Sequence, residues 1–313
     1  MRDTLWSTPA LFPLRLIATE NKLVWVPVSE QRYREVNFLD DRELSTRECE
    51  ESALDETLRD YEAMRLPPRL VHCIFHTAYC GSTLLSRCLD HLAQAHVLRE
   101  PLCLHELAEE RRHRLSHERD AREWRRRFDL VMALLARTFR PEQVSIVKTT
   151  DACTHLVAEV LARTESSRAL FLYTDLEDFL GAVLSDEERR GFVRLRLGDL
   201  AALRREDPVF HAGDRHDWSD AAQASLLWAL QMHVYASLVA AKPNAASARY
   251  LHEAPATPAA CALMDCRAVH AADESYWRRL SFWRTPQHDC HDHRGEACAD
   301  WFDWSDAWAR IRG

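Results

Sequence analysis

Short apolar runs alternate with longer amphipathic segments along most of the chain. These runs predict strands at residues 70–75, 96–99, 143–148 and 168–173, and residues 248–252 predict a fifth strand. The segments between them carry apolar residues at helical spacing and predict helices over residues 82–93, 117–139, 154–163 and 219–241, and from Leu176 and Pro258 onward. Because strands that alternate with helices pair in parallel through right-handed crossovers, we expect an α/β fold with a parallel sheet flanked by helices.

The N-terminal residues follow a different pattern. Residues 10–38 alternate between apolar and polar positions, and residues 20–22 have the composition of a hairpin turn between two strands. Residues 43–65 are charged, with apolar residues at helical spacing, and predict a surface helix that ends at two prolines. We therefore divide the chain into an N-terminal hairpin and helix packed on the core (1–66), an α/β domain (67–285) and a helical or irregular C-terminal extension (286–313).

Composition limits the class of protein. The 313 residues are 47% hydrophobic with only 7 Gly and 12 Pro, which favours one large α/β domain over a disordered or all-β chain. The net charge of −8 argues against nonspecific nucleic-acid binding. No run approaches the ~20 apolar residues of a membrane span, and the N-terminus lacks the apolar core of a secretory signal. Because the 10 Cys are scattered, we expect reduced thiols in a cytoplasmic protein, and the Ala, Leu and Arg content is typical of bacteria.

Residues 69–87 carry the most informative motif. Their apolar run is followed by a tight turn at residues 79–81 and by the start of an amphipathic helix at Ser82. Unpaired backbone N–H groups and the positive end of the helix dipole converge at such a turn, and Ser82 and Thr83 add hydroxyl donors. We expect this cradle to bind a nucleotide phosphate, and a strand–helix turn without a ligand is the alternative. No Lys precedes Ser82, so the motif is not a Walker A loop.

Further motifs follow this one in a fixed order. The series is C-G-S-T-L-L from Cys80, L-R-E-P from Leu98, V-K-T-T from Val147, L-Y-T-D-L-E-D from Leu172 and A-R-Y-L-H-E from Ala248. Over residues 69–270 it resembles the sulfotransferases that use 3′-phosphoadenosine-5′-phosphosulfate (PAPS), above all bacterial sulfotransferase-family proteins and tyrosylprotein sulfotransferases. The resemblance implies a P-loop-type parallel sheet, PAPS as co-substrate, and transfer of a sulfuryl group to a hydroxyl or amine of a small molecule or peptide.

The resemblance also implies roles for individual residues. The loop that holds the 5′-phosphosulfate would consist of Thr77, Ala78, Tyr79, Cys80, Gly81, Ser82 and Thr83. Glu100 stands where the tyrosylprotein enzymes have their catalytic base, and Lys148 where they have a Lys that stabilises charge on the transferring group. His76, at the end of the first core strand, is a candidate to hydrogen-bond a phosphate or act as a base. Thr174 and Asp178 fall in the element that binds the 3′-phosphate.

Some positions depart from the family pattern. Tyr79 replaces a Lys or Arg that contacts the 5′-phosphate, whereas Thr174 replaces an Arg and Ala182 a Ser that bind the 3′-phosphate. Replacement cations are available at Arg87, Arg99, Arg189 and Arg190. The sequence therefore leaves open a protein of the same fold that binds a nucleotide or a partner without transferring a group.

Two further alternatives concern metals. A phosphotransferase that uses a nucleoside triphosphate needs a metal-binding Asp after a strand, and Asp151 and Asp175 are candidates. The segment from His288 to His293, with Cys298 nearby, has residue types that ligate zinc, although its spacing is more typical of a polar loop. Sulfuryl transfer itself needs no metal, so we expect none.

Overall fold

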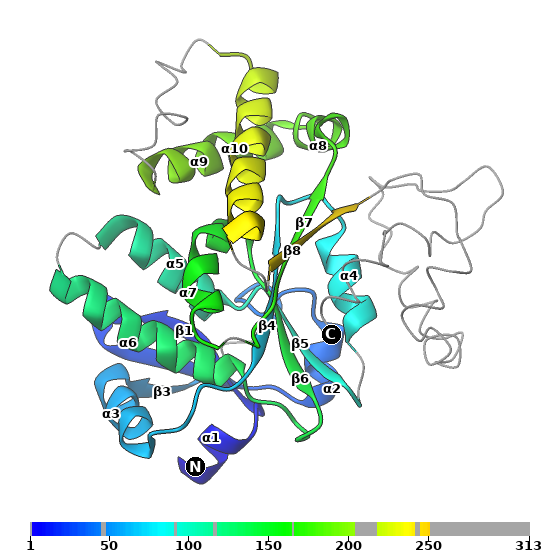
Figure 1. The fold of residues 1–313 in the computed structure, drawn as a ribbon. Helices are drawn as coiled ribbons and strands as arrows, with labels where there is room; N and C mark the ends of the chain where they lie inside the picture. The colour runs from blue at the N-terminus through cyan, green and yellow to red at the C-terminus, as the bar shows by residue number, and fades with distance from the viewer. Residues whose placement is uncertain are drawn as a thin grey trace.

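A five-stranded parallel sheet lies at the centre of the protein (Figure 1). The computed structural model describes residues 2–44, 48–90, 93–114, 118–164, 166–203, 218–241 and 245–250. The strand order is β5 (Ala95–Arg99), β6 (Val144–Lys148), β4 (Val71–His76), β7 (Ala169–Thr174) and β8 (Ala245–Tyr250). The expected α/β class with a parallel sheet is thus confirmed, and each strand lies close to one of the apolar runs.

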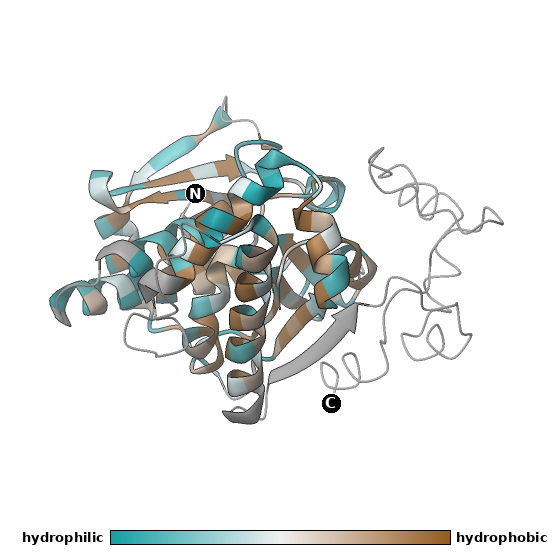
Figure 2. Ribbon diagram, turned by 90° about the horizontal axis from the view of Figure 1, so that it is seen from above, coloured by the Kyte–Doolittle hydropathy of each residue, from teal (hydrophilic) through white to brown (hydrophobic). Residues whose placement is uncertain are grey.

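Helices cover both faces of the sheet because alternate strand residues point in opposite directions. One face, which includes Ile74 and Ile146, packs on Leu85 of α4 (Ser82–Leu89). The other face, which includes Phe75 and Val147, belongs to a larger core. The helices of that core include α5 (Leu102–Arg114), α6 (Glu118–Leu135) and α7 (Val157–Leu161), which follows the short helix η3 (Asp151–Leu156). Figure 2 shows hydrophobic strands between helices in which hydrophobic and hydrophilic positions alternate.

Three further helices are grouped near the carboxyl end of β7, and the last of them runs back along the sheet (Figure 1). They are α8 (Leu176–Val183), α9 (Glu187–Leu203) and α10 (Asp220–Ala241). A separate small core joins them, with Phe179 from α8, Leu197 from α9 and Leu227 from α10. This packing fixes α9 beside the edge of the sheet at which the strands end. None of the helices in the described part of the chain is both long and apolar enough to cross a membrane.

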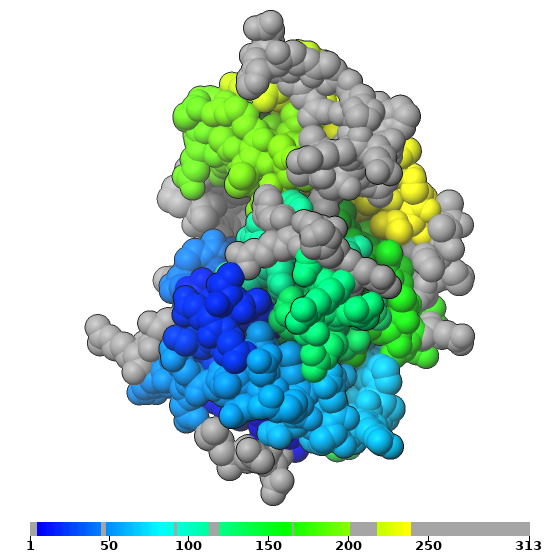
Figure 3. Space-filling model, turned by 90° about the vertical axis from the view of Figure 1, so that its left-hand side faces the viewer, coloured from blue at the N-terminus to red at the C-terminus, as the bar shows by residue number. Residues whose placement is uncertain are grey.

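The N-terminal residues form an antiparallel sheet that packs on the main core. Its strands β1 (Leu11–Ile17), β2 (Lys22–Pro27) and β3 (Glu50–Ala53) lie in that order. The short helices around it are α1 (Arg2–Ser7), η1 (Ala18–Glu20), α2 (Glu30–Glu35) and α3 (Leu54–Met64). Phe12 and Leu14 share the larger core with Phe128 of α6, so no separate core divides the two parts. In Figure 3 these N-terminal residues, in blue, lie against the teal-green residues of α5 and α6.

The helix expected over residues 43–65 is wrong in its first half. Residues 50–53 form strand β3, where Ser52 accepts a hydrogen bond from the Trp25 indole at 2.8 Å, and the α-helix α3 begins only at Leu54. Asn21 fixes the boundary, because its backbone and side-chain oxygens accept hydrogen bonds from the first N–H groups of α3. This partner lies far away in sequence, so helical spacing alone could not reveal the boundary.

Other helix boundaries also differ from expectation. α4 ends at Leu89 rather than at residue 93, and the helix expected over residues 154–163 starts as η3 at Asp151. The predicted helical ranges did not include α1, α2, α5 or α9. The helix expected from Pro258 and the extension 286–313, with its His288–His293 segment, lie outside the described residues.

Candidate functional site

A cavity of about 520 Å³ opens at the carboxyl ends of β4, β5 and β6. This is the edge at which open parallel sheets bind their ligands. Its lining comprises Phe38, Asp40, Arg42, His76, Ala78, Tyr79, Cys80, Gly81, Ser82, Thr83, Glu100, Leu102, His105, Lys148, Thr150, Asp151, Phe192 and Arg196. Segments far apart in the sequence therefore meet here: the loop after β4, the ends of β5 and β6, an N-terminal loop and helix α9.

The loop between β4 and α4 has a strained backbone. Ala78 has a φ of 67°, Tyr79 of 51° and Gly81 of 72°, all in the left-handed region. Gly81 adopts this conformation at no steric cost, whereas Ala78 and Tyr79 do not. Backbone strain of this kind persists only where surrounding contacts impose it, and it clusters at functional sites.

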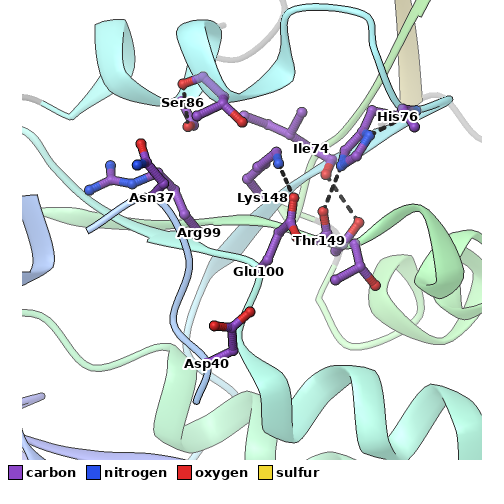
Figure 4. Close-up of polar contacts among 12 residues, drawn as sticks. Asn37, Asp40, Ile74, His76, Ser86, Arg99, Glu100, Lys148 and Thr149 are labelled. Atoms are coloured by element: carbon purple, nitrogen blue, oxygen red, sulfur yellow. Dashed lines mark hydrogen bonds and ion pairs between the residues drawn. The ribbon is translucent and has the colours of Figure 1, made fainter. Parts of the chain in front are cut away.

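Hydrogen bonds made by His76 and Cys80 hold the loop in this conformation. The Nδ1 atom of His76 accepts the Ala78 N–H at 3.1 Å, and its Nε2–H donates to the Thr149 carbonyl at 2.8 Å (Figure 4). The Cys80 thiol donates to the Leu172 carbonyl at 3.5 Å. The loop is therefore tied to both strands that flank β4.

The helix α4 begins at this loop and presents its N-terminus to the cavity. Gly81 is the N-cap residue and contributes no side-chain cap, and the first helical bond runs from the Leu85 N–H to the Gly81 carbonyl at 3.0 Å. The first-turn amides from Ser82 onward have no carbonyl partner within the helix. Together with the helix dipole, these amides make the cradle a favourable place for an anion.

Glu100 and Lys148 form an ion pair at the base of the cavity (Figure 4). They stand at the ends of β5 and β6, where the Glu100 N–H also donates to the Lys148 carbonyl at 2.7 Å. Glu100 has a φ of 51°, a left-handed turn that carries the chain out of the strand next to Lys148. The Lys148 side chain is 2% exposed and that of Glu100 is 15% exposed. This pair gives the cavity a buried cation beside a carboxylate that solvent still reaches.

The two arginines among the described residues of the lining are also paired with acids. Arg42 bonds to Asp40, lies 4.1 Å above the Phe38 ring and comes within 3.9 Å of Glu100. Arg196 donates from Nε to Asp151 at 2.6 Å. The lining thus balances the cations Arg42, Lys148 and Arg196 against the acids Asp40, Glu100 and Asp151. An anion that enters the cavity has to compete with carboxylates already present.

The electrostatics of two groups in the lining follow from burial. Burial raises the pKa of the Asp151 carboxyl, although Arg196 beside it acts in the opposite direction. Burial lowers the pKa of His76 well below its ordinary value, and the nearby Lys148 lowers it further. His76 is therefore neutral at physiological pH, with both ring nitrogens engaged in hydrogen bonds.

Most of the residues that the sequence singled out do meet in this cavity. The loop residues 78–83 line it together with His76, Glu100 and Lys148. Thr77 lies beneath the loop, fully buried, with its N–H bonded to the Leu172 carbonyl at 3.2 Å. The structure favours a positioning role for His76 over the base role expected for it, because both ring nitrogens are used to hold the loop.

Thr174 and Asp178 are not among the described residues that line the cavity, so their expected role with the 3′-phosphate stays a prediction. Thr174 is buried, and its hydroxyl donates to the Asp178 carboxylate at 3.3 Å. Its carbonyl accepts the Trp228 indole N–H at 2.9 Å. The Thr174 hydroxyl and carbonyl at this strand end are thus both bonded within the protein.

The replacement cations suggested by the sequence lie elsewhere. Arg99 is fully buried and donates to Asp90 at 3.0 Å, and Arg87 donates to Asn37 at 3.2 Å. Arg190 bonds to Glu187 at 3.0 Å on the surface of α9. Arg189 comes nearer, with its guanidinium 5.0 Å from the centre of the Tyr79 ring.

Sequence reasoning missed the residues that close the cavity from the sides. Arg42 and Phe38 come from a segment next to the helix that was expected at residue 43, and Phe192 and Arg196 come from the unpredicted α9. An Arg-rich charged helix is ordinarily a solvated surface, so the sequence around residues 187–203 carries no signal for this role.

Comparison with known proteins supplies no relative. No protein-family model, curated protein or solved structure matches the chain. The geometry of the cavity and the sequence motifs that line it are therefore the basis for a functional proposal.

Proposed function

We propose that the protein is a sulfotransferase that moves a sulfuryl group from PAPS to a hydroxyl or amine of a small molecule or peptide. The observation that carries the proposal is the Glu100–Lys148 pair, which opens onto the same cavity as the amide cradle. A base, a buried cation and an oxyanion seat are the three parts that an in-line sulfuryl transfer requires.

The chemistry assigns one task to each part. The acceptor oxygen or nitrogen attacks sulfur and forms a new bond to it, while the bond from sulfur to the oxygen of the 5′-phosphate breaks. Glu100 takes the proton that the acceptor loses. Once protonated, Glu100 no longer neutralises Lys148, whose ammonium then stabilises the negative charge on the leaving oxygen. Adenosine 3′,5′-bisphosphate and the sulfated acceptor leave the site, so atoms and charge balance.

The residues fit the two ends of PAPS unequally. The cradle at Gly81–Thr83 and the cation of Lys148 suit the phosphosulfate end. The 3′-phosphate end finds no partner at Thr174 and Asp178, because the hydroxyl is bonded to the carboxylate and the carboxylate repels an anion. Binding of the nucleotide then depends on the other cations of the lining.

The cysteines support a cytoplasmic setting for this activity. Cys73, Cys80, Cys103 and Cys153 are buried free thiols. Burial raises the pKa of Cys80, so it stays a thiol rather than a thiolate. Reduced cysteines of this kind are typical of intracellular proteins.

A binding protein without transfer activity is the second candidate function. The balance of acids and cations among the described residues of the lining favours it, because an anionic donor has to displace a carboxylate from its partner. In that case the same cradle would hold a nucleotide or a partner, and the Glu100–Lys148 pair would have a structural role.

Thermal-shift measurements separate these functions. We expect adenosine 3′,5′-bisphosphate at 100 times its dissociation constant to stabilise the protein by about 2.7 kcal/mol. Stabilisation only by ATP with Mg²⁺ would instead point to phosphoryl transfer. If neither nucleotide changes the unfolding temperature, the sulfotransferase proposal is wrong and the binding-protein alternative gains.

A further inference from the structure

One face of helix α9 lies over the loop that follows β4. Arg189, Phe192 and Arg196 are three and four residues apart and so lie on the same side of the helix. The Phe192 ring packs edge-to-face on the Tyr79 ring at 5.8 Å, and the Arg196 guanidinium lies 5.6 Å from the Phe192 ring centre. The helix therefore forms a wall of the cavity beside the amide cradle, and that wall carries a cation.

The cradle lacks a cation of its own. Residues 77–83 include no Lys or Arg, and the position at which a basic residue was expected is Tyr79. An oxyanion that leaves water for a partly enclosed cavity needs a charged partner as well as amide donors. That partner has to come from the cations of the lining.

Among the described arginines of the lining, Arg196 is the more enclosed. Lys148 is engaged by Glu100 at the base of the cavity. Arg42 has a side chain that is 62% exposed, and it bonds to Asp40 at the rim. Arg196 has a side chain that is only 13% exposed and projects from α9 into the lining.

Arg196 is held in place but keeps one donor group available. Its Nε donates to Asp151 at 2.6 Å and its Nη1 donates to Asp199 at 2.9 Å. Asp199 is fixed in turn by an ion pair with the buried Arg112. Within the described part of the chain, the Nη2 group of Arg196 makes no hydrogen bond. A guanidinium oriented in advance on two carboxylates binds an anion with little further loss of conformational freedom.

We propose that Arg196 is the arginine that binds the oxyanion of the donor, with its Nη2 group directed at a phosphate or sulfuryl oxygen seated on the cradle. Helix α9 thus supplies the cation that the loop lacks. The identity of the donor as PAPS rests on the proposed function, but binding of a phosphate group by Arg196 does not.

Calorimetric titration with two anions tests this role. The probes are adenosine 3′,5′-bisphosphate and inorganic pyrophosphate, applied to the full chain. We expect Arg196→Met to weaken binding of each by about 10- to 100-fold, as loss of a charge-assisted hydrogen bond does, and Arg196→Lys to restore part of the affinity. Arg190→Met is the matched control, because Arg190 lies on the same helix outside the lining, and it should change affinity less than twofold.

A second variant guards against loss of folding. Arg196→Met leaves Asp151 buried without its partner, so Arg196→Met combined with Asp151→Asn removes the unpaired charge as well. Weak binding by a folded double variant supports the role of Arg196. Binding within twofold of the wild-type value in either folded variant overturns it, and so does a wild-type protein that binds neither anion. A wild-type protein that binds pyrophosphate through Arg196 but not adenosine 3′,5′-bisphosphate refutes PAPS as the donor and leaves Arg196 as the anion-binding residue.

Discussion

The carboxyl ends of β5 and β6 differ from that of β7 in whether their polar side chains face the cavity. At the ends of β5 and β6, Glu100 and Lys148 pair with one another on the wall of a cavity. At the end of β7, the Thr174 hydroxyl bonds to Asp178 and the Thr174 carbonyl accepts the Trp228 indole, outside the lining. Both strand ends carry polar residues in sequence, but only the first end keeps them available to a ligand.

The difference teaches that a polar residue at a strand end is a functional candidate only when the backbone leaves it facing open space. Glu100 owes its position to a left-handed φ of 51° directly after β5. Thr174, in contrast, ends β7 in an ordinary strand geometry and is followed at once by the N-cap of α8. The strand ends that line the cavity therefore also carry the strained backbone, in keeping with the left-handed residues of the neighbouring loop.

Substitution of Lys148 should have the largest effect among the variants that test this comparison. We expect Lys148→Met to lower sulfuryl transfer by about 10²- to 10³-fold, because a buried cation that stabilises developing charge is lost. Transfer is measured with PAPS carrying a radiolabelled sulfuryl group. Lys22→Met, at an exposed ion pair of the N-terminal sheet, is the control and should leave transfer unchanged. Near-normal transfer by a folded Lys148→Met protein would show that Lys148, at the end of β6, has no role in the reaction.

Acid should weaken the fold through histidines that stay neutral in the folded chain. Burial lowers the pKa of His72 and of His155 to about 4, whereas both are near 6.5 in the unfolded chain. The unfolded chain then binds more protons, so stability is complete above about pH 6.5 and is lost as the pH falls from there toward 4.

Each pKa unit corresponds to about 1.4 kcal/mol, so several kcal/mol are at stake between these two residues. Urea midpoints recorded from pH 7 to pH 5 should decline steadily. His72→Asn keeps an acceptor for the Arg168 N–H, which His72 binds at 3.1 Å, and should flatten the decline. A midpoint that does not change over this range would show that these histidines are not buried as described.

The β7 end should respond least to substitution. Thr174→Val removes the hydroxyl that binds Asp178 and keeps the side-chain shape, so we expect a loss of about 1 kcal/mol in stability. Affinity for adenosine 3′,5′-bisphosphate should stay within twofold of the wild-type value, because Thr174 does not reach the cavity. Calorimetry and urea unfolding on the same variant check both statements. A tenfold loss of nucleotide affinity would show that the end of β7 takes part in nucleotide binding.

Much of the fold could be predicted from the sequence because burial leaves a periodic pattern. The strands from β4 to β7 appear as apolar runs, and helices such as α6 and α10 follow helical spacing. Boundaries set by distant partners could not be predicted in this way. Strand β3 is extended because it pairs with β2, and α3 starts where Asn21 caps it, although the residues themselves are compatible with one long helix.

The site could be predicted only in part, for a related physical reason. Glu100, Lys148 and the loop at 78–83 lie at strand ends, so their meeting follows from parallel pairing alone. Arg42 and Arg196 reach the cavity through the packing of the N-terminal segment and of α9, which no local pattern encodes. Spacing also could not show that Thr174 would bond to Asp178, or that both nitrogens of His76 would be engaged.

Release of adenosine 3′,5′-bisphosphate from PAPS, in the presence of phenol, alcohol and amine acceptors, tests the central claim most directly. The account predicts release by the wild-type protein and by the control Glu62→Gln, whose side chain pairs with Arg126 at the surface. It predicts loss of release in Glu100→Gln, with nucleotide binding nearly intact. Undiminished release by Glu100→Gln, or none by the wild-type protein, would contradict it.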